Sequence, residues 1–135
     1  MGNRILRAIA VFTLLLLLAA CRSSAPTQDT RLSFDLLSII PETLMVGATE
    51  ITLRVTREGA PLANAAVAIT GDMTHAGMEP VSASAQTDAD GIVRIPMAWT
   101  MSGDWVVRVS VTAPDGGLRT GEFPLIINDA APPGS

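Results

Sequence analysis

The chain is poor in the side chains on which most metal, redox and nucleic-acid sites depend. Its 135 residues include one cysteine, one histidine, no lysine and no tyrosine, and only 4% are aromatic. A single cysteine excludes an intrachain disulfide, and one cysteine with one histidine excludes a zinc site built from several such side chains. A c-type haem needs a Cys-x-x-Cys-His motif, and a blue-copper site needs two histidines and a cysteine. Both of these sites are therefore excluded as well.

The balance of charges excludes a second class of function. Nine basic and thirteen acidic residues give a formal net charge of −4, and without Arg4 and Arg7 near the N-terminus the charge becomes −6. An acidic chain without clustered arginines is a poor match for the phosphates of nucleic acids. We expect no nucleic-acid partner.

The sequence also lacks the common signatures of catalysis. It contains no Gly-x-Ser-x-Gly elbow, no phosphate-binding glycine loop and no dinucleotide fingerprint. No pairing of a nucleophile with a base, and no pair of carboxylates, stands out either. The length is enough for one small domain. We therefore expect a binding or structural module and not an enzyme.

The N-terminus has the pattern of an export signal. Arg4 and Arg7 precede an apolar run from Ala8 to Ala20, which is shorter than the roughly 20 residues of a membrane span but suits a signal-peptide core. The run ends in Leu18-Ala19-Ala20-Cys21, which resembles the lipobox of bacterial lipoproteins, where the cysteine is lipidated after cleavage just before it. We predict a signal peptide over residues 1–20 and lipidation at Cys21. The alternative is an ordinary secretory signal with a chance cysteine.

Polar segments flank the predicted domain. Residues 21–31 carry Ser, Pro and Thr without a hydrophobic period, which predicts a flexible tether, and residues 129–135 predict a short disordered tail. Arg22 stands where many Gram-negative lipoproteins have the Asp that retains them in the inner membrane. By that analogy we expect a lipid anchor on the extracytoplasmic side, in the outer membrane of a two-membrane cell or on the outer face of the cytoplasmic membrane.

Alternating apolar and polar residues predict short β-strands between the two flanking segments. The clearest alternation covers residues 105–111, where Trp105, Val107 and Val109 face the predicted core and Arg108 faces outward. Asp-Gly and Pro-Asp-Gly turns separate the alternating runs, which lie at residues 32–36, 51–55, 67–69, 81–87, 92–97, 105–111 and 123–127. Seven short strands predict an all-β fold, an Ig-like antiparallel two-sheet sandwich over residues 32–128.

Three segments together resemble one known family. Gly59-Ala60-Pro61-Leu62-Ala63-Asn64-Ala65-Ala66-Val67, Thr87-Asp88-Ala89-Asp90-Gly91 and Met101-Ser102-Gly103-Asp104-Trp105 are similar to motifs of the YtkA-like domain, a small exported β-sandwich related in style to FixH-like proteins. The similarity covers about residues 45–128. The resemblance implies a role in copper handling or in the assembly of a terminal oxidase.

The only histidine lies in a loop that suits copper. Met73, His75 and Met78 follow a Met-x-His-x-x-Met spacing between two predicted strands, and thioether sulfur with imidazole nitrogen suits Cu(I). Met97 and Met101 fall nearby in the sequence as candidate additional donors, and Trp99 between them as a candidate aromatic lid. The alternative is that the methionines fill an irregular core and the histidine is a solvated surface residue.

Two functions from different classes follow. The chain is either an anchored copper-binding accessory that carries Cu(I) or helps to assemble an oxidase, or a metal-free module that docks on a membrane complex. The Asp88-x-Asp90-Gly91 sequence resembles the start of a calcium loop, but the downstream bidentate carboxylate is missing, so we predict a turn there.

Overall fold

The computed structural model describes residues 26–75 and 77–130, and all regular structure in them is β-strand. The predicted signal peptide, Cys21 and the last five residues lie outside the described part. Among the described residues there is no helix long and apolar enough to cross a membrane. The strands are β1 (Leu32–Ile40), β2 (Gly47–Arg57), β3 (Ala60–Pro61), β4 (Ala66–Met73), β5 (Val81–Gln86), β6 (Ile92–Trp99), β7 (Gly103–Thr112) and β8 (Leu118–Ile127).

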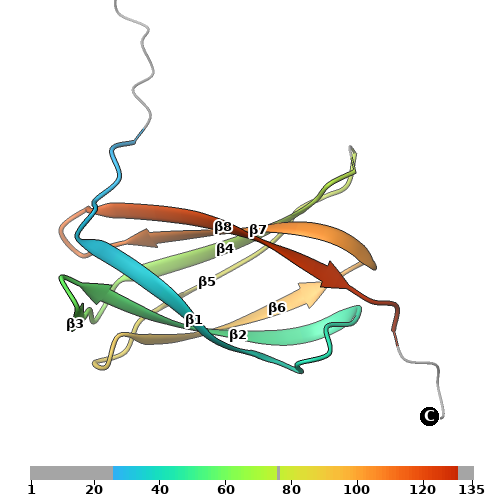
Figure 1. Cartoon of the computed structure of the whole chain (residues 1–135), viewed down its shortest axis with the longest axis horizontal. Coiled ribbons are helices and arrows are strands. Elements are labelled where there is room, and N and C mark those ends of the chain that lie inside the picture. The colour runs from blue at the N-terminus through green and yellow to red at the C-terminus, as the bar shows by residue number, and fades with distance from the viewer. Residues whose placement is uncertain (1–25, 76, 131–135) are drawn as a thin grey trace, which may run out of the picture.

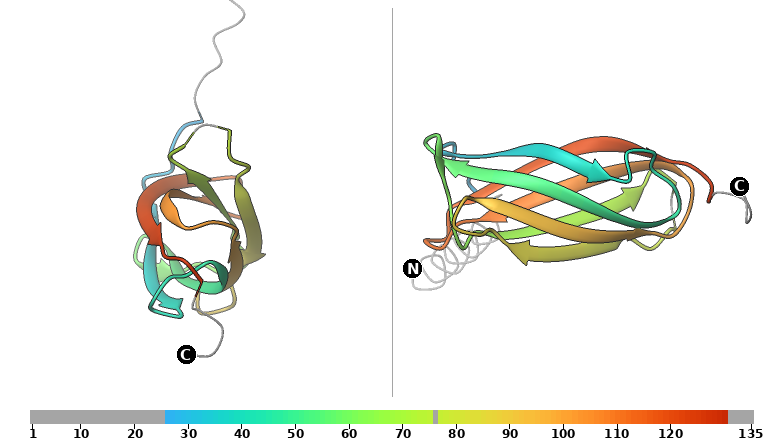
Figure 2. Two further views of the ribbon diagram at one scale, coloured as in Figure 1. Left: turned by 90° about the vertical axis from the view of Figure 1, so that its right-hand side faces the viewer. Right: turned by 90° about the horizontal axis from the view of Figure 1, so that it is seen from below.

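The strands form two antiparallel sheets packed face to face (Figures 1 and 2). In sheet 1, β2 pairs with β1 on one side and with β3 and β6 on the other; sheet 2 has the order β5-β4-β7-β8. Both sheets are four-stranded. The prediction of an all-β antiparallel sandwich is confirmed.

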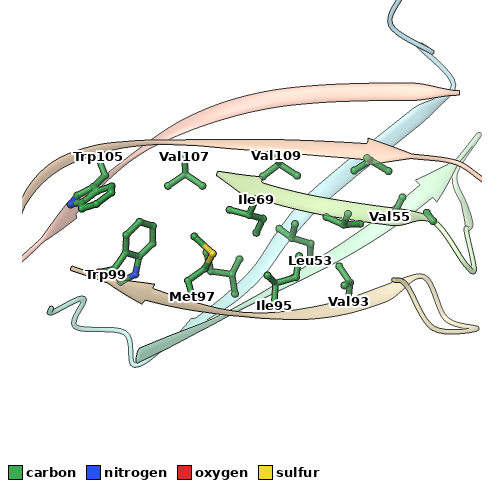
Figure 3. Packing of buried hydrophobic residues seen from close by; sticks show 14 of the residues in the cluster. Leu53, Val55, Ile69, Val93, Ile95, Met97, Trp99, Trp105, Val107 and Val109 are labelled. Carbon is green, nitrogen blue, oxygen red and sulfur yellow. The ribbon is translucent and has the colours of Figure 1, made fainter. Parts of the chain in front are cut away.

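Strand alternation places the core between the sheets. In β7, Trp105, Val107 and Val109 are buried while Arg108 is exposed, as the sequence predicts. Figure 3 shows these three side chains of β7 facing those of Val93, Ile95, Met97 and Trp99 from β6. The apolar faces of both sheets are thus removed from water, which supplies most of the driving force for folding.

All seven predicted strands are present, but most of them extend beyond the predicted runs. β1 continues to Ile40, past a register shift between Leu36 and Ser38, and such a bulge breaks the alternation that marks a strand in the sequence. β4 ends at Met73 where the prediction ended at residue 69, and β8 begins at Leu118 where the prediction began at residue 123. The structure adds β3, whose two residues are too few for any periodic pattern.

The segment before β1 is bound to the sandwich and not free. Gln28 forms a parallel bridge with Leu118, and its side-chain amide exchanges two hydrogen bonds with Thr120, at 2.7 and 2.8 Å. The Asp29 amide donates to the Leu118 carbonyl at 2.6 Å. The ordered domain therefore begins earlier than residue 32, because polar side chains of the predicted tether find partners on β8 that the local sequence does not reveal.

Two carboxylates and two arginines connect the segment before β1 to the turn between β7 and β8. Arg57 on β2 donates to Asp29 at 3.0 Å and to Asp115 at 2.8 Å, and Arg31 donates to Asp29 at 2.9 Å. Hydrogen bonds from Arg31 hold the pKa of Asp29 well below its usual range, and hydrogen bonds from Arg57 lower the pKa of Asp115 to about 2. The network therefore strengthens as these carboxylates ionise.

Acid should weaken this network. A carboxylate whose pKa is lower in the folded than in the unfolded chain stabilises the fold above its ordinary pKa, which is 3.8, and this contribution is lost as the pH falls toward 2. We expect Arg57→Gln to lower stability at about pH 6 and to have a smaller effect near pH 2. Urea unfolding midpoints of both proteins at each pH measure the difference. If the unfolding midpoints of the wild type and Arg57→Gln differ equally at both pH values, the ionised carboxylates do not stabilise the fold through Arg57.

Candidate functional site

The predicted copper loop and the β6–β7 turn meet at one end of the sandwich. Residues 74–80 connect β4 to β5, and residues 100–102 connect β6 to β7. Met73 at the end of β4 pairs with Trp105 near the start of β7. This end, which we call the loop end, lies opposite the residues that precede β1 (Figure 1). The two connections are far apart in the sequence, and antiparallel pairing of β4 with β7 brings them together.

Met73 is held at the boundary between the loop and the core. Its side chain is half-buried and packs against the core cluster. Its terminal methyl Cε lies 2.9 Å from the position that a Cβ at Gly103 would take, so the end of the side chain lies directly against this glycine. The Thr74 amide donates to the Asp104 carbonyl at 3.1 Å and extends the β4–β7 pairing into the loop. Met73 therefore has a fixed position beside the β6–β7 turn.

His75 and Met78 lie on the outside of the loop. His75 is exposed, and 37% of Met78 is exposed, so both side chains are accessible to a metal ion or to another protein. Met78 follows the only histidine of the sequence by three residues, so the loop presents a methionine and an imidazole to solvent, and core packing does not explain this exposure.

The two remaining candidate donors have opposite environments. Met101 in the β6–β7 turn is 45% exposed, and its carbonyl accepts a hydrogen bond from the Trp105 indole at 3.1 Å. Met97 on β6 is 3% exposed and belongs to the core cluster. Packing, the alternative considered for the methionines, is what the structure shows for Met97. Met97 occupies an inward position of β6, whereas Met101 lies beyond the end of this strand, in the turn.

Trp99 lies in the core beneath the loop end. It is 2% exposed, its ring centroid lies 5.1 Å from that of Trp105 with an interplanar angle of 66°, and its ring packs over Gly71. An edge-to-face pair of this kind stabilises a core by about 0.5–1.5 kcal/mol beyond area burial. The structure therefore assigns Trp99 to packing, and the prediction of an aromatic lid over the loop is wrong.

The donor types available at the loop end favour soft metals. Within residues 26–75 and 77–130 no group of three or more His, Cys, Asp or Glu side chains is placed to hold a metal ion. A site at this end would draw on thioether sulfur from Met73, Met78 and Met101 and on one imidazole. This donor set fits Cu(I), which prefers neutral sulfur ligands, and is a poor match for Zn(II), which takes thiolate, imidazole and carboxylate.

The Asp88–Gly91 segment is a turn, as predicted. The Asp88 carboxylate oxygen Oδ1 accepts hydrogen bonds from the amides of Asp90 and Ile92, each at 2.9 Å. Carboxylates used in this way shape the backbone of a turn.

One surface feature was missed by the sequence analysis. A hollow of about 680 Å³ lies on the outer face of sheet 1, where Asp35 and Arg54 are cross-strand neighbours. Its lining comes from several separate segments, so no local motif marks it: Asp35, Arg54, Thr56, Gly59, Pro61, Asp90 and Ile92.

Comparisons with known proteins agree with the fold. The family model described as YtkA-like matches residues 27–110. No match was found among curated protein sequences. A superoxide reductase (neelaredoxin) from Ignicoccus hospitalis is similar in structure, with a TM-score of 0.52, 12% identity, and coverage of 71% of this chain and 80% of that one.

Two further solved structures show weaker similarity. A conjugative transposon lipoprotein from Bacteroides eggerthii has a TM-score of 0.47 and 12% identity, covering 72% of this chain and 98% of its own. CopC from Methylosinus trichosporium has a TM-score of 0.44 and 15% identity, covering 74% of this chain and 98% of its own. At these identities the likeness is one of fold, and chemistry has to be argued from the residues of the chain itself.

Proposed function

Because the chain belongs to the YtkA-like family, and because its accessible thioethers and only imidazole gather at one end of the sandwich, we propose that it is a copper-binding accessory of the cell envelope. In this proposal Met73, His75 and Met78 bind Cu(I) as cargo, to be held or passed to a membrane oxidase or another envelope complex. The observation that carries the proposal is the exposure of His75 and Met78 in the loop that follows the half-buried Met73.

The chemistry of these residues favours reversible carriage over catalysis. Thioethers bind a soft cation without losing a proton, so these sulfur ligands can load and release Cu(I) with no change in their protonation. No nucleophile paired with a base stands out in the sequence. The proposed role is therefore binding, and the fold shared with a superoxide reductase carries no implication of that activity.

The proposed anchor and the proposed site lie at different places along the chain. Lipidation at Cys21 would attach the chain to a membrane through the segment that enters the sandwich at the end opposite the loop. Strands of this length rise about 3.3 Å per residue, so the loop end lies about 30 Å from residue 32. A site there would be accessible to soluble or membrane-bound partners on the extracytoplasmic side.

Cys21→Ala tests the anchor. Stable attachment needs the lipid that this cysteine would carry, so we expect the variant to be released from the membrane fraction or to accumulate as an uncleaved precursor. Fractionation with intact mass measurement distinguishes these states. An unmodified wild-type protein that begins at another residue would contradict lipidation at Cys21.

Copper binding is tested by competition with a Cu(I) chelator, using the full-length protein purified without a metal-binding tag. We expect Met73→Leu/Met78→Leu and His75→Ala to lose at least tenfold in affinity, the range seen when metal-site partners are removed. Leucine keeps the volume and apolarity of methionine, so the double variant should remain folded. Zn(II) should compete poorly.

Met97→Leu is the matched control for this experiment. It makes the same side-chain change at a methionine that is buried in the core, so affinity should stay at the wild-type value. If the wild type competes no better than the double leucine variant, and that variant is also less stable, the loop methionines serve packing and the copper proposal is wrong.

A metal-free docking module is the second candidate function, and one surface favours it. Leu36, Leu37 and Ile40 on the edge strand β1 are 46%, 46% and 58% exposed. Apolar side chains on an edge strand mark a site where another chain can pair. Charged substitutions at Leu37 and Ile40 that abolish recovery of a membrane complex, in a chain that binds no copper, would favour this function.

A further inference from the structure

We propose that the β6–β7 turn forms the second half of the copper site, in which Met101 contributes its thioether and Trp105 is a positioning residue that holds the turn. This inference rests on the proposed function and extends it from one loop to two. It assigns to Trp105 a role besides packing. In the Met101–Trp105 motif, the methionine would bind the metal and the tryptophan would hold the backbone of that methionine.

The first observation is the hydrogen bond between the indole and the turn. Trp105 is 1% exposed, so its ring is fixed by the core, and its Nε1 donates to the Met101 carbonyl at 3.1 Å. The bond therefore connects the rigid interior of the sandwich to the backbone of an exposed residue. Ser102 next to it donates from Oγ to the Asp129 carboxylate at 2.6 Å. The turn is thus attached on two sides, to β7 and to the residues that follow β8.

The second observation is the close approach of Met73 to the same turn. A Cβ at position 103 would lie 2.9 Å from Met73 Cε, and Gly103 has a φ of +131°, which side chains rarely adopt. Glycine at this position therefore lets the end of the Met73 side chain lie against the start of β7, two residues after Met101 in the chain.

The third observation is the state of the Met101 side chain. Its carbonyl is held by the Trp105 indole, and 45% of the residue is exposed, so the side chain is accessible to a metal ion from solvent. Ligands held in place before the metal arrives bind it more tightly, because less ordering is needed on binding. Met101 has a carbonyl held by the core and an exposed side chain, and it lies two residues before Gly103, against which the end of the Met73 side chain lies.

The structure offers a matched control for the indole bond. Trp99 is the other buried tryptophan, it contacts Trp105 edge to face, and its Nε1 has no hydrogen-bond partner among the described residues. Trp99→Phe and Trp105→Phe therefore remove the same ring volume from the same pair. Only Trp105→Phe removes a hydrogen bond to the turn.

The experiment measures Cu(I) affinity by chelator competition for the full-length protein and for Met101→Leu, Trp105→Phe, Trp99→Phe and the Met101→Leu/Trp105→Phe double variant. We expect Met101→Leu and Trp105→Phe each to weaken binding by about tenfold or more, as removal of ligands and of their orienting partners does. Trp99→Phe should bind like the wild type. If Trp105 acts through Met101, the double variant should be no weaker than Met101→Leu alone.

X-ray absorption at the copper edge gives a readout that packing does not change. Met101→Leu should lower the number of sulfur neighbours of bound copper by one, while Trp99→Phe should leave it unchanged. Unfolding midpoints of every variant separate loss of ligation from loss of folding.

Three results of these measurements would overturn the proposals. A wild-type protein that fails to compete for Cu(I) overturns the proposed function, and this inference with it. A wild type that binds copper while Met101→Leu binds equally well and keeps its sulfur count overturns the inference alone. Equal losses from Trp105→Phe and Trp99→Phe would overturn the positioning role of Trp105.

Discussion

We expect Val109→Asp to leave the domain unfolded in water. Val109 is fully buried, pairs with Ile69 on β4 and Gly121 on β8, and lies at the centre of the core. An unpaired carboxylate there costs several kcal/mol or more to bury, and domains of this size have about 5–15 kcal/mol of stability in total. Far-UV circular dichroism and the dispersion of amide resonances measure the loss of the fold.

The neighbouring residue provides the control. Arg108 is exposed and forms a 2.7 Å ion pair with Glu122, so Arg108→Gln should cost no more than about 1 kcal/mol. Arg108→Asp should also fold, although it would place a third carboxylate near Glu122 and Asp72. Equal damage at positions 108 and 109 would mean that the register of β7 is wrong, because a slip of one residue exchanges the two faces of a strand.

Gly91→Ala should destabilise the domain by about 3 kcal/mol, through backbone crowding together with an unfavourable φ. Gly91 has a φ of +73°, and a Cβ there would lie 2.4 Å from the Val55 carbonyl oxygen and 3.0 Å from the Leu62 nitrogen. The Gly91 carbonyl also accepts from the Val55 amide at 2.7 Å. The methyl group would therefore push the turn away from β2, and urea unfolding measures the loss.

Gly59→Ala separates the two causes of that loss. Gly59 has a similar φ of +83° but nothing lies within 4 Å of its Cβ position. Its substitution should therefore cost only the strain of the left-handed conformation, about 1 kcal/mol. If Gly91→Ala is no more destabilising than Gly59→Ala, the packing of the turn against β2 is looser than the structure indicates.

The fold was predictable because residues within each strand and each turn indicate that strand or turn by themselves. Alternation along β7 assigns Trp105, Val107 and Val109 to the core, and it does so without knowledge of any other strand, because successive side chains of an extended chain point to opposite faces. The Asp88–Gly91 and Pro114–Gly117 turns are likewise encoded by residues that favour turns. Where the pattern fails, as at the bulge of β1, a local irregularity interrupts the alternation.

The arrangement of the candidate site depends on contacts between segments distant in the sequence. By itself the sequence determined the strand pattern, the resemblance to the family and the presence of soft donors around His75. Only the tertiary structure decided that Met97 packs in the core, that Met73 lies against Gly103 and that Trp105 holds the Met101 turn. The physical reason is that a shift of one residue in strand register moves a side chain from the core to the surface. In addition, the pairing of β4 with β7 determines which loops lie at the same end of the sandwich.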